Sequence, residues 1–357
     1  MSEIKRKLAS LQKIAAINSI LGRDRIEVAK ILGWEIIVQK GLYKVGDLCV
    51  FFEVDSLLPD IPIFDFMKEK RLRVKPMKMA GVISQGLAIP LSDLAIIEKD
   101  KNVSVVKEEG NDLTDLIGVV KYELPEEVKL WYKDQKIAGK FPFFIPKTDE
   151  PRIQSYPELL NEMVNRDVEI TVKLDGTSFT AYYDKTANEF GVCSRNVKIA
   201  EGDNLYWNIV KKYNLQEQLK NYIHQSNLKD ISLIAIQGEI CGPKIQGNTL
   251  KLKEPNLFIY NILHDRQYIN FSNTIIIFGL LTVPRMHTKY RITEITTIDD
   301  LVEIAMSSNI YSTFDLGNKR EGIVVRPLIE DTVKTPGSSL LGNRLSFKVI
   351  NPMYGME

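Results

Sequence analysis

Four strand-like segments of the chain each carry a charged residue where an apolar one would be expected. They are "VKLDG" with Lys173 and Asp175, "IQGEICG" with Glu239, "REGIVVRP" with Glu321 and "LSFKVI" with Lys348. A buried lysine or carboxylate is rare unless it is paired or chemically employed. Each segment alone is explained equally well by a buried ion pair, but all four together favour one shared site, because burying these charges separately would be expensive.

Lys173 and Asp175 have the spacing of neighbours on one face of a strand. The surrounding stretch "EITVKLDGTSFTAYY" is rich in β-branched and aromatic residues, as strands are. Residues i and i+2 of a strand point to the same side, so the two side chains project together. Gly176 then leaves room for a ligand or a backbone to approach closely. Lys173 is therefore either neutralised by Asp175 or placed to react.

A lysine among carboxylates has the parts needed for covalent capture of a nucleotide. Burial and nearby cations lower the pKa of a lysine and make its amine nucleophilic. Carboxylates hold Mg²⁺ through a few direct or water-mediated contacts. A metal and a second lysine would neutralise a phosphate oxygen as charge moves to the leaving group. Attack by Lys173 on a nucleotide α-phosphate, with loss of pyrophosphate and formation of a lysine phosphoramidate, uses all of these parts.

The segments resemble, in order and spacing, the motifs of the covalent nucleotidyltransferases, the superfamily of ATP-dependent polynucleotide ligases and mRNA capping enzymes. "KLDG" resembles motif I, "SRN" motif Ia, "GEICG" motif III, "LFIYNI" motif IIIa, "EGIVVR" motif IV and "LSFKVI" motif V. Motif I alone recurs by chance, whereas the ordered set is specific. "PRIQ", "GPKIQGN" and the N-terminal "DRIEVAKILGW", "GDLCVFFEVDSLLP" and "ISQGL" further resemble RNA ligases with an N-terminal OB-like domain, a type known from an amoeboflagellate and a radiation-resistant bacterium.

The resemblance implies a role for each matching charged position in the motifs. Lys173 would be adenylylated, and Lys348 would contact the α-phosphate. Asp175, Glu239 and Glu321 would serve the metal. Asp175 would hold the metal's waters, and Glu239 would also bind the ribose hydroxyls.

The resemblance also implies the binding of the rest of the nucleotide. Arg195 would hold a phosphate or the ribose, and it could instead cap a turn. Arg152 and Lys147 lie upstream, where the family's pyrophosphate contacts are expected. Phe258 and Tyr260 alternate with apolar neighbours, so one of them is a core residue, and we assign the stacking on adenine to Phe258.

Two further assignments concern the edges of the site. Lys244 and Asn248, in the "GPKIQGN" loop, are candidates for RNA contact only. Motif V of the superfamily often has two lysines two positions apart, whereas here Ser346 and Ile350 flank Lys348. The second phosphate contact is therefore absent or supplied by Arg344.

The activity implied is that of an ATP-dependent RNA ligase with ATP and Mg²⁺ (or Mn²⁺) as cofactors. It would join 3′-OH and 5′-phosphate ends of RNA, as in a nicked duplex, in RNA repair, and would act as a monomer. The alternatives are a DNA or nick-sealing ligase and a GTP-using capping enzyme, which typically carry an OB domain after the transferase domain, whereas this chain ends nine residues past Lys348. An inactive nucleotide- or RNA-binding module is the third alternative, and an intact nucleophile argues against it.

The elements that would position these residues form two domains. Residues 1–122 contain short strand-like runs separated by Gly, Asn and Asp turns, which predict an all-β, OB-like barrel. The proline-rich residues 123–147 predict a linker. Residues 148–357 alternate strands with an amphipathic helix in "NLYWNIVKKYNLQEQLKNYIH" but lack a regular βαβ rhythm, which predicts an α+β nucleotidyltransferase domain with antiparallel sheets.

A run of six basic residues between Lys68 and Lys78 stands out in the N-terminal domain. Charges on an edge strand protect it from pairing with another chain. The same one-sign run would also suit a nucleic-acid-facing surface. We expect the barrel to bind RNA, or to help orient the leaving group of ATP, because OB-type barrels bind single strands with basic grooves and aromatic side chains.

Composition sets broad limits on the class of protein. The 357 residues are 44% hydrophobic and 26% charged with a formal net charge of +1, which describes an ordinary soluble protein and argues neither for nor against nucleic acid. The three cysteines are far apart and predict no disulfide framework, and the N-terminus lacks the apolar core of a secretory signal. The longest apolar run, residues 275–283, is too short to span a bilayer. We expect an intracellular, cytoplasmic protein in a reducing compartment, without a membrane partner.

Overall fold

The computed structural model describes residues 6–122, 136–224, 230–269, 279–307 and 320–354. The chain divides into two compact units. The N-terminal unit contains the described residues up to 122 together with residues 153–157. The C-terminal unit contains the described residues of 136–152 and 158–354. Of the predicted linker, residues 123–135 lie outside the described residues.

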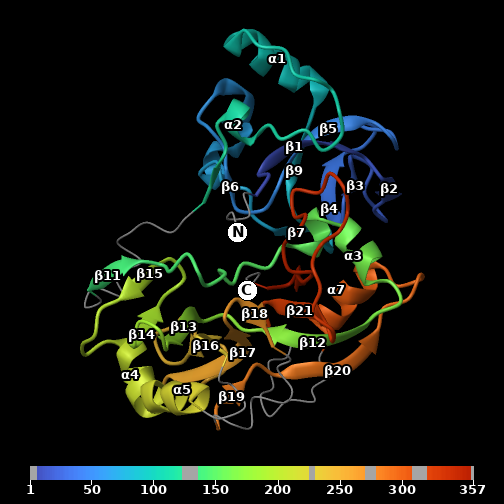
Figure 1. Ribbon diagram of the computed structural model, residues 1–357. Helices are drawn as coiled ribbons and strands as arrows, with labels where there is room; N and C mark the ends of the chain where they lie inside the picture. The colour runs from blue at the N-terminus through green and yellow to red at the C-terminus, as the bar shows by residue number, and fades with distance from the viewer. Residues whose placement is uncertain (1–5, 123–135, 225–229, 270–278, 308–319, 355–357) are drawn as a thin grey trace. The chain divides into compact units, whose positions relative to one another are not determined.

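The N-terminal unit is built from short antiparallel strands, as predicted (Figure 1). One sheet has the order β1 (Ala9–Lys13), β5 (Leu48–Phe52), β9 (Leu87–Pro90), and another has the order β2 (Ala16–Ser19), β3 (Ile26–Ile31), β4 (Trp34–Gln39). Two pairs complete the strands: β6 (Ser56–Leu57) with β10 (Val120–Lys121), and β7 (Met77–Met79) with β8 (Val82–Ser84). The helices are η1 (Pro62–Lys70), α1 (Leu91–Lys101) and α2 (Thr114–Ile117).

Strand β5 shows why the N-terminal unit has apolar clusters on two sides of a sheet. Successive side chains of a strand point to opposite faces. Val50 and Phe52 belong to one cluster, which includes Phe64 of η1, whereas Cys49 and Phe51 belong to a second cluster with residues of β3 and β4. The apolar run "LCVFF" is therefore buried on both faces.

The C-terminal unit contains two antiparallel sheets that together position the candidate site. The larger sheet runs β11-β15-β14-β13-β16-β17-β18, and β19 pairs in parallel with β17. Its strands are β11 (Ile137–Lys140), β13 (Thr177–Asp184), β14 (Glu189–Cys193), β15 (Val197–Ile199), β16 (Leu233–Cys241), β17 (Asn256–His264), β18 (Gln267–Tyr268) and β19 (Leu281–Thr282). The smaller sheet has the order β20 (Arg285–Arg291), β12 (Asp167–Lys173), β21 (Gly322–Pro327), β22 (Phe347–Ile350).

Strand β11 corrects the predicted linker at its C-terminal end. Residues 137–140 fall within the predicted connector of residues 123–147, but they pair with β15 and extend the larger sheet. The prolines that suggested a connector flank this short strand. Proline is compatible with strand ends and sheet edges, so its presence did not exclude a strand here.

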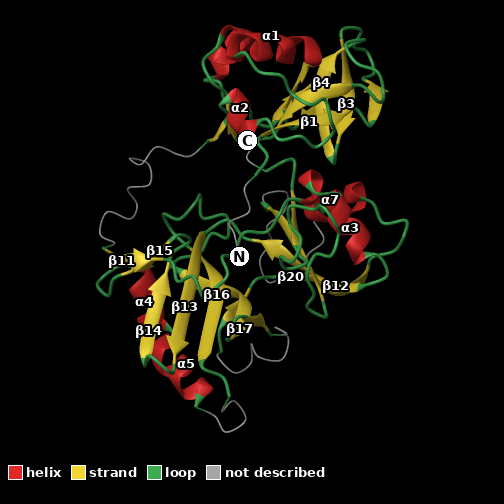
Figure 2. Ribbon diagram, turned by 45° about the horizontal axis from the view of Figure 1, so that its top comes forward, coloured by secondary structure: helices red, strands yellow, loops and turns green. Residues whose placement is uncertain are grey.

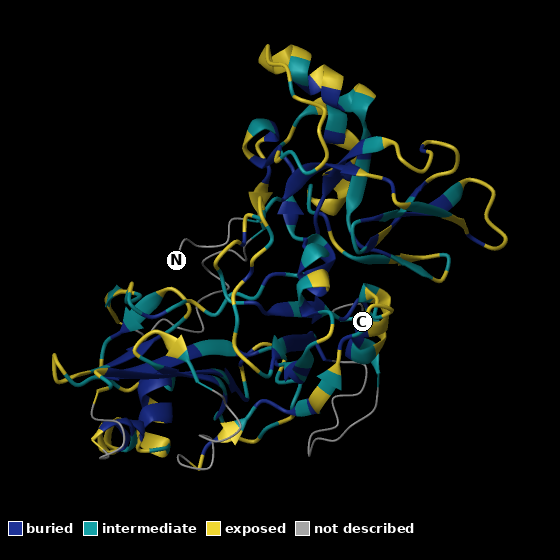
Figure 3. Cartoon of the chain, turned by 45° about the vertical axis from the view of Figure 1, so that its right-hand side comes forward, coloured by how far each residue is buried: buried dark blue, intermediate teal, exposed yellow. Residues whose placement is uncertain are grey.

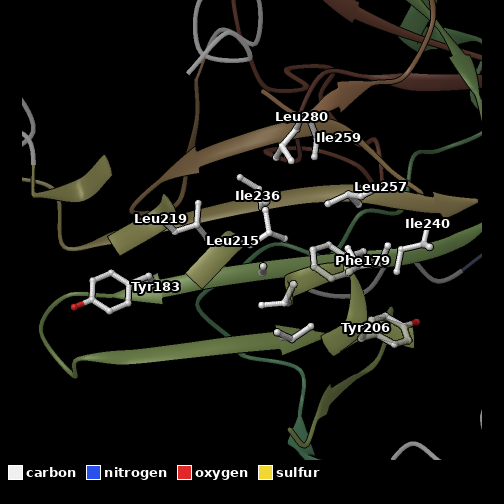
Figure 4. Close-up of a cluster of buried hydrophobic side chains, with 14 of the residues drawn as sticks. Phe179, Tyr183, Tyr206, Leu215, Leu219, Ile236, Ile240, Leu257, Ile259 and Leu280 are labelled. Atoms are coloured by element: carbon white, nitrogen blue, oxygen red, sulfur yellow. The ribbon is translucent and has the colours of Figure 1, made fainter. Parts of the chain in front are cut away.

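Helices α4 (Leu205–Lys212) and α5 (Leu215–Ile223) cover one face of the larger sheet. We predicted one helix for this stretch, but it breaks at Tyr213 and Asn214, and Asn214 has the left-handed φ of 47°. Figure 2 shows both helices along strands β13, β14 and β16. Their apolar sides pack on Phe179, Ile236 and other sheet residues in the cluster of Figure 4.

The remaining helices of the C-terminal unit are α3 (Glu158–Met163) and α7 (Ile298–Met306). The short helix η3 (Ile153–Ser155) lies in the segment grouped with the N-terminal unit. Thr297 and Asp300 form a capping box at the start of α7. Helix α7 packs on β21 and β22, and β21 is buried along most of its length. Buried segments of the chain are dark blue in Figure 3. In the described ranges, every helix is too short or too polar to cross a membrane.

Candidate active site

Lys173 is the last residue of β12, and the alternation of this strand explains its unusual position. Val168, Ile170 and Val172 are buried on the apolar face of the strand. Lys173 lies on the opposite face with Thr171. The apolar neighbours in the sequence therefore hold the strand in place, while the amine is only partly buried and opens into a cavity.

The cavity has a volume of about 270 Å³ and lies between the two sheets of the C-terminal unit. Both sheets contribute side chains to it, Lys173 and Lys348 from the smaller and Glu239 from the larger. Arg195 also lines it, from the turn between β14 and β15. The further lining residues are Thr148, Asp149, Glu150, Thr171, Val172, Leu174, Gly176, Thr177, Ser178, Gln246, Tyr260, Val283, Val324 and Arg326.

Lys173 lies among three carboxylates. Its Nζ donates a hydrogen bond to Glu321 Oε2 at 2.5 Å. Burial by itself would lower the pKa of Lys173, but Glu321, Glu239 and Asp175 outweigh it, so the pKa is raised. The three carboxylates thus act on the same amine, which is the convergence that the sequence predicts.

The carboxylates are short of positive charge. Burial raises the pKa of Glu239 to about 8, helped by Glu321 and Asp175 and opposed by Lys173. Burial and Glu321 also raise the pKa of Asp175, which accepts a hydrogen bond from the hydroxyl of Tyr354. Carboxylates that repel one another in this way favour the binding of a cation.

Positive charges lie close together on the other side of Lys173. Burial lowers the pKa of Lys348 to about 7, and Lys173 and Arg152 lower it further against the opposing effect of Asp149 and Glu321. Arg152 forms a β-bridge with Lys348, and the backbone N–H of Lys348 donates to the carbonyl of Pro151 at 2.8 Å. An anion between these groups would be stabilised. The site therefore fits a ligand that brings an anion and a cation together.

The donor set fits a hydrated divalent cation better than a closed metal cage. Within the described ranges, no group of three or more His, Cys, Asp or Glu side chains is close enough to hold an ion by itself. The predicted trio of Asp175, Glu239 and Glu321 therefore does not form a complete set of direct ligands. Mg²⁺ and Mn²⁺ prefer oxygen donors, and Mg²⁺ usually keeps several waters.

Two glycines allow the strands of the site to approach closely. A Cβ on Gly176 would lie 2.8 Å from Cγ of Glu239 and would clash with the carbonyl oxygen of Ile240. A Cβ on Gly322 would clash with the carbonyl oxygen of Val349. The first glycine brings the segment after Lys173 against the strand of Glu239, and the second brings Glu321 to the C-terminal strand. Gly176 thus makes room for a backbone.

Tyr260, and not Phe258, lines the cavity, so our assignment of the stacking residue is wrong. Both side chains lie on the same face of β17, but Phe258 is fully buried opposite Glu239 in the neighbouring strand. The ring of Tyr260 forms part of the cavity wall, and its hydroxyl hydrogen-bonds with Thr148 and Ser178.

The remaining predicted residues lie at various distances from the cavity. Arg195 forms an ion pair with Asp149, which also lines the cavity. Lys147 donates to Asn196 Oδ1 at 3.3 Å in an exposed position beside the lining segment. Lys244 and Asn248 lie in the loop after β16 and are not among the lining residues, whereas Gln246 between them is.

Arg344, the alternative source of a second motif V contact, is not among the residues that line the cavity of Lys173. It is held by Glu330 and by Asn261 Oδ1 at 2.9 Å, and its guanidinium stacks on Tyr268 at 3.8 Å from the ring centroid. It lines an adjoining pocket and not the cavity of Lys173. The flanking Ser346 donates a hydrogen bond to Glu150.

Sequence reasoning missed Glu150, Arg326 and Tyr354. Arg326 donates to Glu150 at 2.9 Å, and its guanidinium lies 5.7 Å from the ring centroid of Tyr260. The signal for Arg326 was its place in the apolar run "GIVVRP", two residues after Val324 and so on the same strand face. Tyr354 had no signal, because nothing in its local pattern indicates that it contacts Asp175.

Comparisons with known proteins agree with this architecture. Residues 8–91 match the model of an OB-fold domain, and residues 166–350, more than half of the chain, match the model of the RNA ligase family. An N-terminal OB-fold domain is thus followed by an RNA ligase domain. The chain belongs to the RNA ligase family.

Solved structures of the Naegleria gruberi RNA ligase are similar over nearly the whole chain. Its structure with PPi is 28% identical, covers 97% of each chain and has a TM-score of 0.77. Mutants of the same ligase are 27% identical and cover 97% of each chain, one with ATP and Mn at a TM-score of 0.78 and one with AMP and Mn at 0.77. A search of the curated proteins found no match.

Proposed function

We propose that this chain is an ATP-dependent RNA ligase that works through a covalent Lys173–AMP intermediate. The observation that carries the proposal is the place of the Lys173 amine, which lies in one cavity with Glu239 and Lys348 and contacts Glu321. The Naegleria ligase structures with ATP, AMP, Mn and PPi support this use of the pocket.

In the first step, Nζ of Lys173 attacks the α-phosphorus of ATP. A nitrogen–phosphorus bond forms, and the bond between the α-phosphorus and the oxygen that bridges to the β-phosphate breaks. Pyrophosphate leaves, and the proton of the amine passes to the solvent. Lys348 stabilises the negative charge on the α-phosphate oxygens. Arg195, which lines the cavity, and Arg152, which is bridged to Lys348, would bind the other phosphates or the ribose. A bound Mg²⁺ or Mn²⁺ supplies positive charge that lowers the pKa of the amine and stabilises the leaving phosphate.

In the second step, an oxygen of the RNA 5′-phosphate attacks the same phosphorus. The nitrogen–phosphorus bond breaks, and Lys173 recovers its proton while AMP passes to the RNA. In the third step, the 3′-OH attacks the RNA phosphate and AMP leaves. The protein contributes mainly position and charge to these steps. The substrate we propose is a nicked duplex in RNA repair, bound by a monomer.

The proposal is tested by mixing the protein with α-labelled ATP or GTP and a divalent metal, followed by a denaturing gel. We expect label from ATP that is lost in Lys173→Ala and on chelation of the metal. Label from GTP alone would indicate a capping enzyme, and no label with any metal would indicate a nucleotide-binding module. Nicked RNA and DNA duplexes in the same assay distinguish an RNA ligase from a DNA ligase.

A further inference from the structure

The N-terminal unit has a cavity of its own, with a volume of about 400 Å³. It lies between η1 and the β7–β8 hairpin, with side chains of β4 and β9 as further walls. Its volume is in the range of small-ligand sites. The lining residues are Ile37, Phe66, Met67, Lys70, Arg73, Val74, Lys75, Pro76, Met77, Met79, Ser84, Gly86 and Leu87.

The walls of this cavity expose large apolar side chains. Phe66 is 58% exposed and Met79 is 40% exposed. Side chains this exposed need not be apolar for the barrel to fold. Met77 adds a second flexible thioether, and methionine adapts to irregular partners and makes favourable contacts with aromatic rings. A flat aromatic ligand would fit this cavity, because it can stack on Phe66 and pack against the methionine side chains.

The charged side chains of the cavity are all basic. Arg73 is compensated, because it pairs with Asp55 Oδ1 at 3.1 Å and stacks on Tyr122 at 3.7 Å. Among the described residues, Lys70 donates to the weak acceptor Met77 Sδ at 3.6 Å, and neither Lys70 nor Lys75 forms an ion pair there. Two lysines without a carboxylate partner in the described part of the chain thus lie beside an apolar pocket.

The structure also separates these lysines from the rest of the basic run. Lys68 is held by Asp60 and Asp65, which is the solvated-surface role that charged residues usually have. Most of the run lies in η1 and the segment after it, so protection of a strand edge is limited to Lys78 in β7. The edge role therefore does not account for Lys70 and Lys75.

We propose that this cavity receives an unstacked nucleobase of the RNA substrate, with the flanking phosphates on Lys70 and Lys75. A single strand combines a π-face at each base with a negative charge at each linkage, and this matches the aromatic wall and the basic rim. The inference rests on the proposed RNA ligase function and assigns part of its RNA binding to named residues outside the catalytic cavity.

The test measures RNA binding separately from catalysis, with the full chain and fluorescent single-stranded and nicked RNA. In Phe66→Ala, we expect affinity for RNA to fall on the order of tenfold, as loss of base stacking does. In the double variant Lys70→Ala/Lys75→Ala, the slope of log affinity against log salt should fall by about 0.7 for each lost phosphate contact. Formation of Lys173–AMP should stay unchanged in both variants.

The controls use exposed apolar and basic side chains elsewhere in the unit. Ile96, which is 53% exposed on α1, is replaced by alanine to match Phe66, and Lys99→Ala/Lys101→Ala matches the double lysine variant. Phe66→Trp should restore binding, and thermal melts show whether each variant is folded. If the cavity variants bind RNA like their controls, the inference is wrong.

Two further outcomes separate RNA binding in this cavity from the binding of acidic polypeptides and from the ligase activity. If polyglutamate competes with RNA, and if its binding is weakened as much as that of RNA in Phe66→Ala, the site binds acidic polypeptides and the inference is wrong. If the wild-type chain binds RNA through Phe66 but never forms Lys173–AMP, the proposed ligase function fails while the RNA site stands.

Discussion

At the scale of single residues, the two sides of the site carry opposite charges. Glu321, Glu239 and Asp175 favour a cation near Lys173, and Lys348 with Arg152 favours an anion. ATP with a divalent metal brings both the cation and the anion. A simple ion pair between Lys173 and Glu321 would need neither. This polarity is the physical reason for interpreting the cluster as a reaction site.

Replacement of Lys348 tests the anion side. Lys348→Ala should slow formation of Lys173–AMP by about 10²–10³-fold. The variant lacks the fixed positive charge that stabilises the negative charge developing on the phosphate oxygens. Single-turnover labelling with α-labelled ATP measures this rate. Lys244→Ala, outside the cavity lining, should label at the wild-type rate. Equal rates in Lys348→Ala and the wild type would rule out the assigned role.

The two aromatic residues of β17 should respond differently to truncation. Tyr260→Ala should raise the KM for ATP on the order of tenfold, since a ring on the cavity wall stacks on a base, and should leave the fold nearly unchanged. Phe258→Ala should instead destabilise the protein by about 3–5 kcal/mol, because its ring is fully buried. Labelling kinetics and denaturant unfolding separate the two effects. The reverse pattern would restore Phe258 as the stacking residue.

At the scale of elements, the close approach of strands fixes the position of Lys173. Gly176→Ala should reduce labelling of Lys173 strongly and destabilise the fold by about 1–3 kcal/mol, because the new methyl group meets the backbone of β16. Gly139→Ala in β11 is a matched control, since a Cβ there meets nothing within 4 Å. Wild-type labelling by Gly176→Ala would show that the β12–β13 turn tolerates displacement.

Removal of one partner of the largely buried pair of Glu150 and Arg326 should be costly, because the side chains are only 14% and 12% exposed. Glu150→Ala leaves Arg326 without its carboxylate and should cost about 3–5 kcal/mol. Glu254→Ala, which breaks an exposed pair with Lys212, should cost at most about 1 kcal/mol. Urea unfolding at neutral pH measures both. Similar losses in the two variants would show that the buried pair is not special.

The same pair predicts a dependence on pH. Burial would raise the pKa of Glu150, but Arg326, Arg344 and Ser346 outweigh it, so the pKa lies below its usual value. A lowered pKa in the folded state stabilises the protein above the unfolded pKa, and this contribution is lost as the pH falls through the folded value. The stability difference between wild type and Glu150→Ala should therefore shrink in acid.

The sequence predicted which strands carry the charged residues of the site better than it predicted which side chains are in contact between neighbouring strands. Lys173, Glu239 and Lys348 stood out because charged residues interrupt apolar runs, which is a local signal. The choice between Phe258 and Tyr260 failed, because residues two apart share a face and only the neighbouring strands decide which one is covered. The helix break at Asn214 and the contact of Tyr354 with Asp175 also depend on tertiary packing.

At the scale of the whole molecule, the OB-fold unit and the ligase unit each have a cavity with a different chemistry. The ligase cavity combines carboxylates and lysines around a nucleophile, whereas the OB-fold cavity combines apolar walls with lysines and lacks acidic lining residues in the described part of the chain. This division suits an enzyme that activates a nucleotide in one unit and holds RNA with the other.

The central claim is that Lys173 becomes covalently joined to AMP. The most direct measurement is mass spectrometry of peptides from protein incubated with ATP and Mn²⁺. We expect an AMP adduct on the peptide containing Lys173. The adduct should be labile to acid, lost when pyrophosphate is added to the intact protein before digestion, and absent from Lys173→Ala. An adduct on another residue, or RNA joining without any adduct at Lys173, would contradict it.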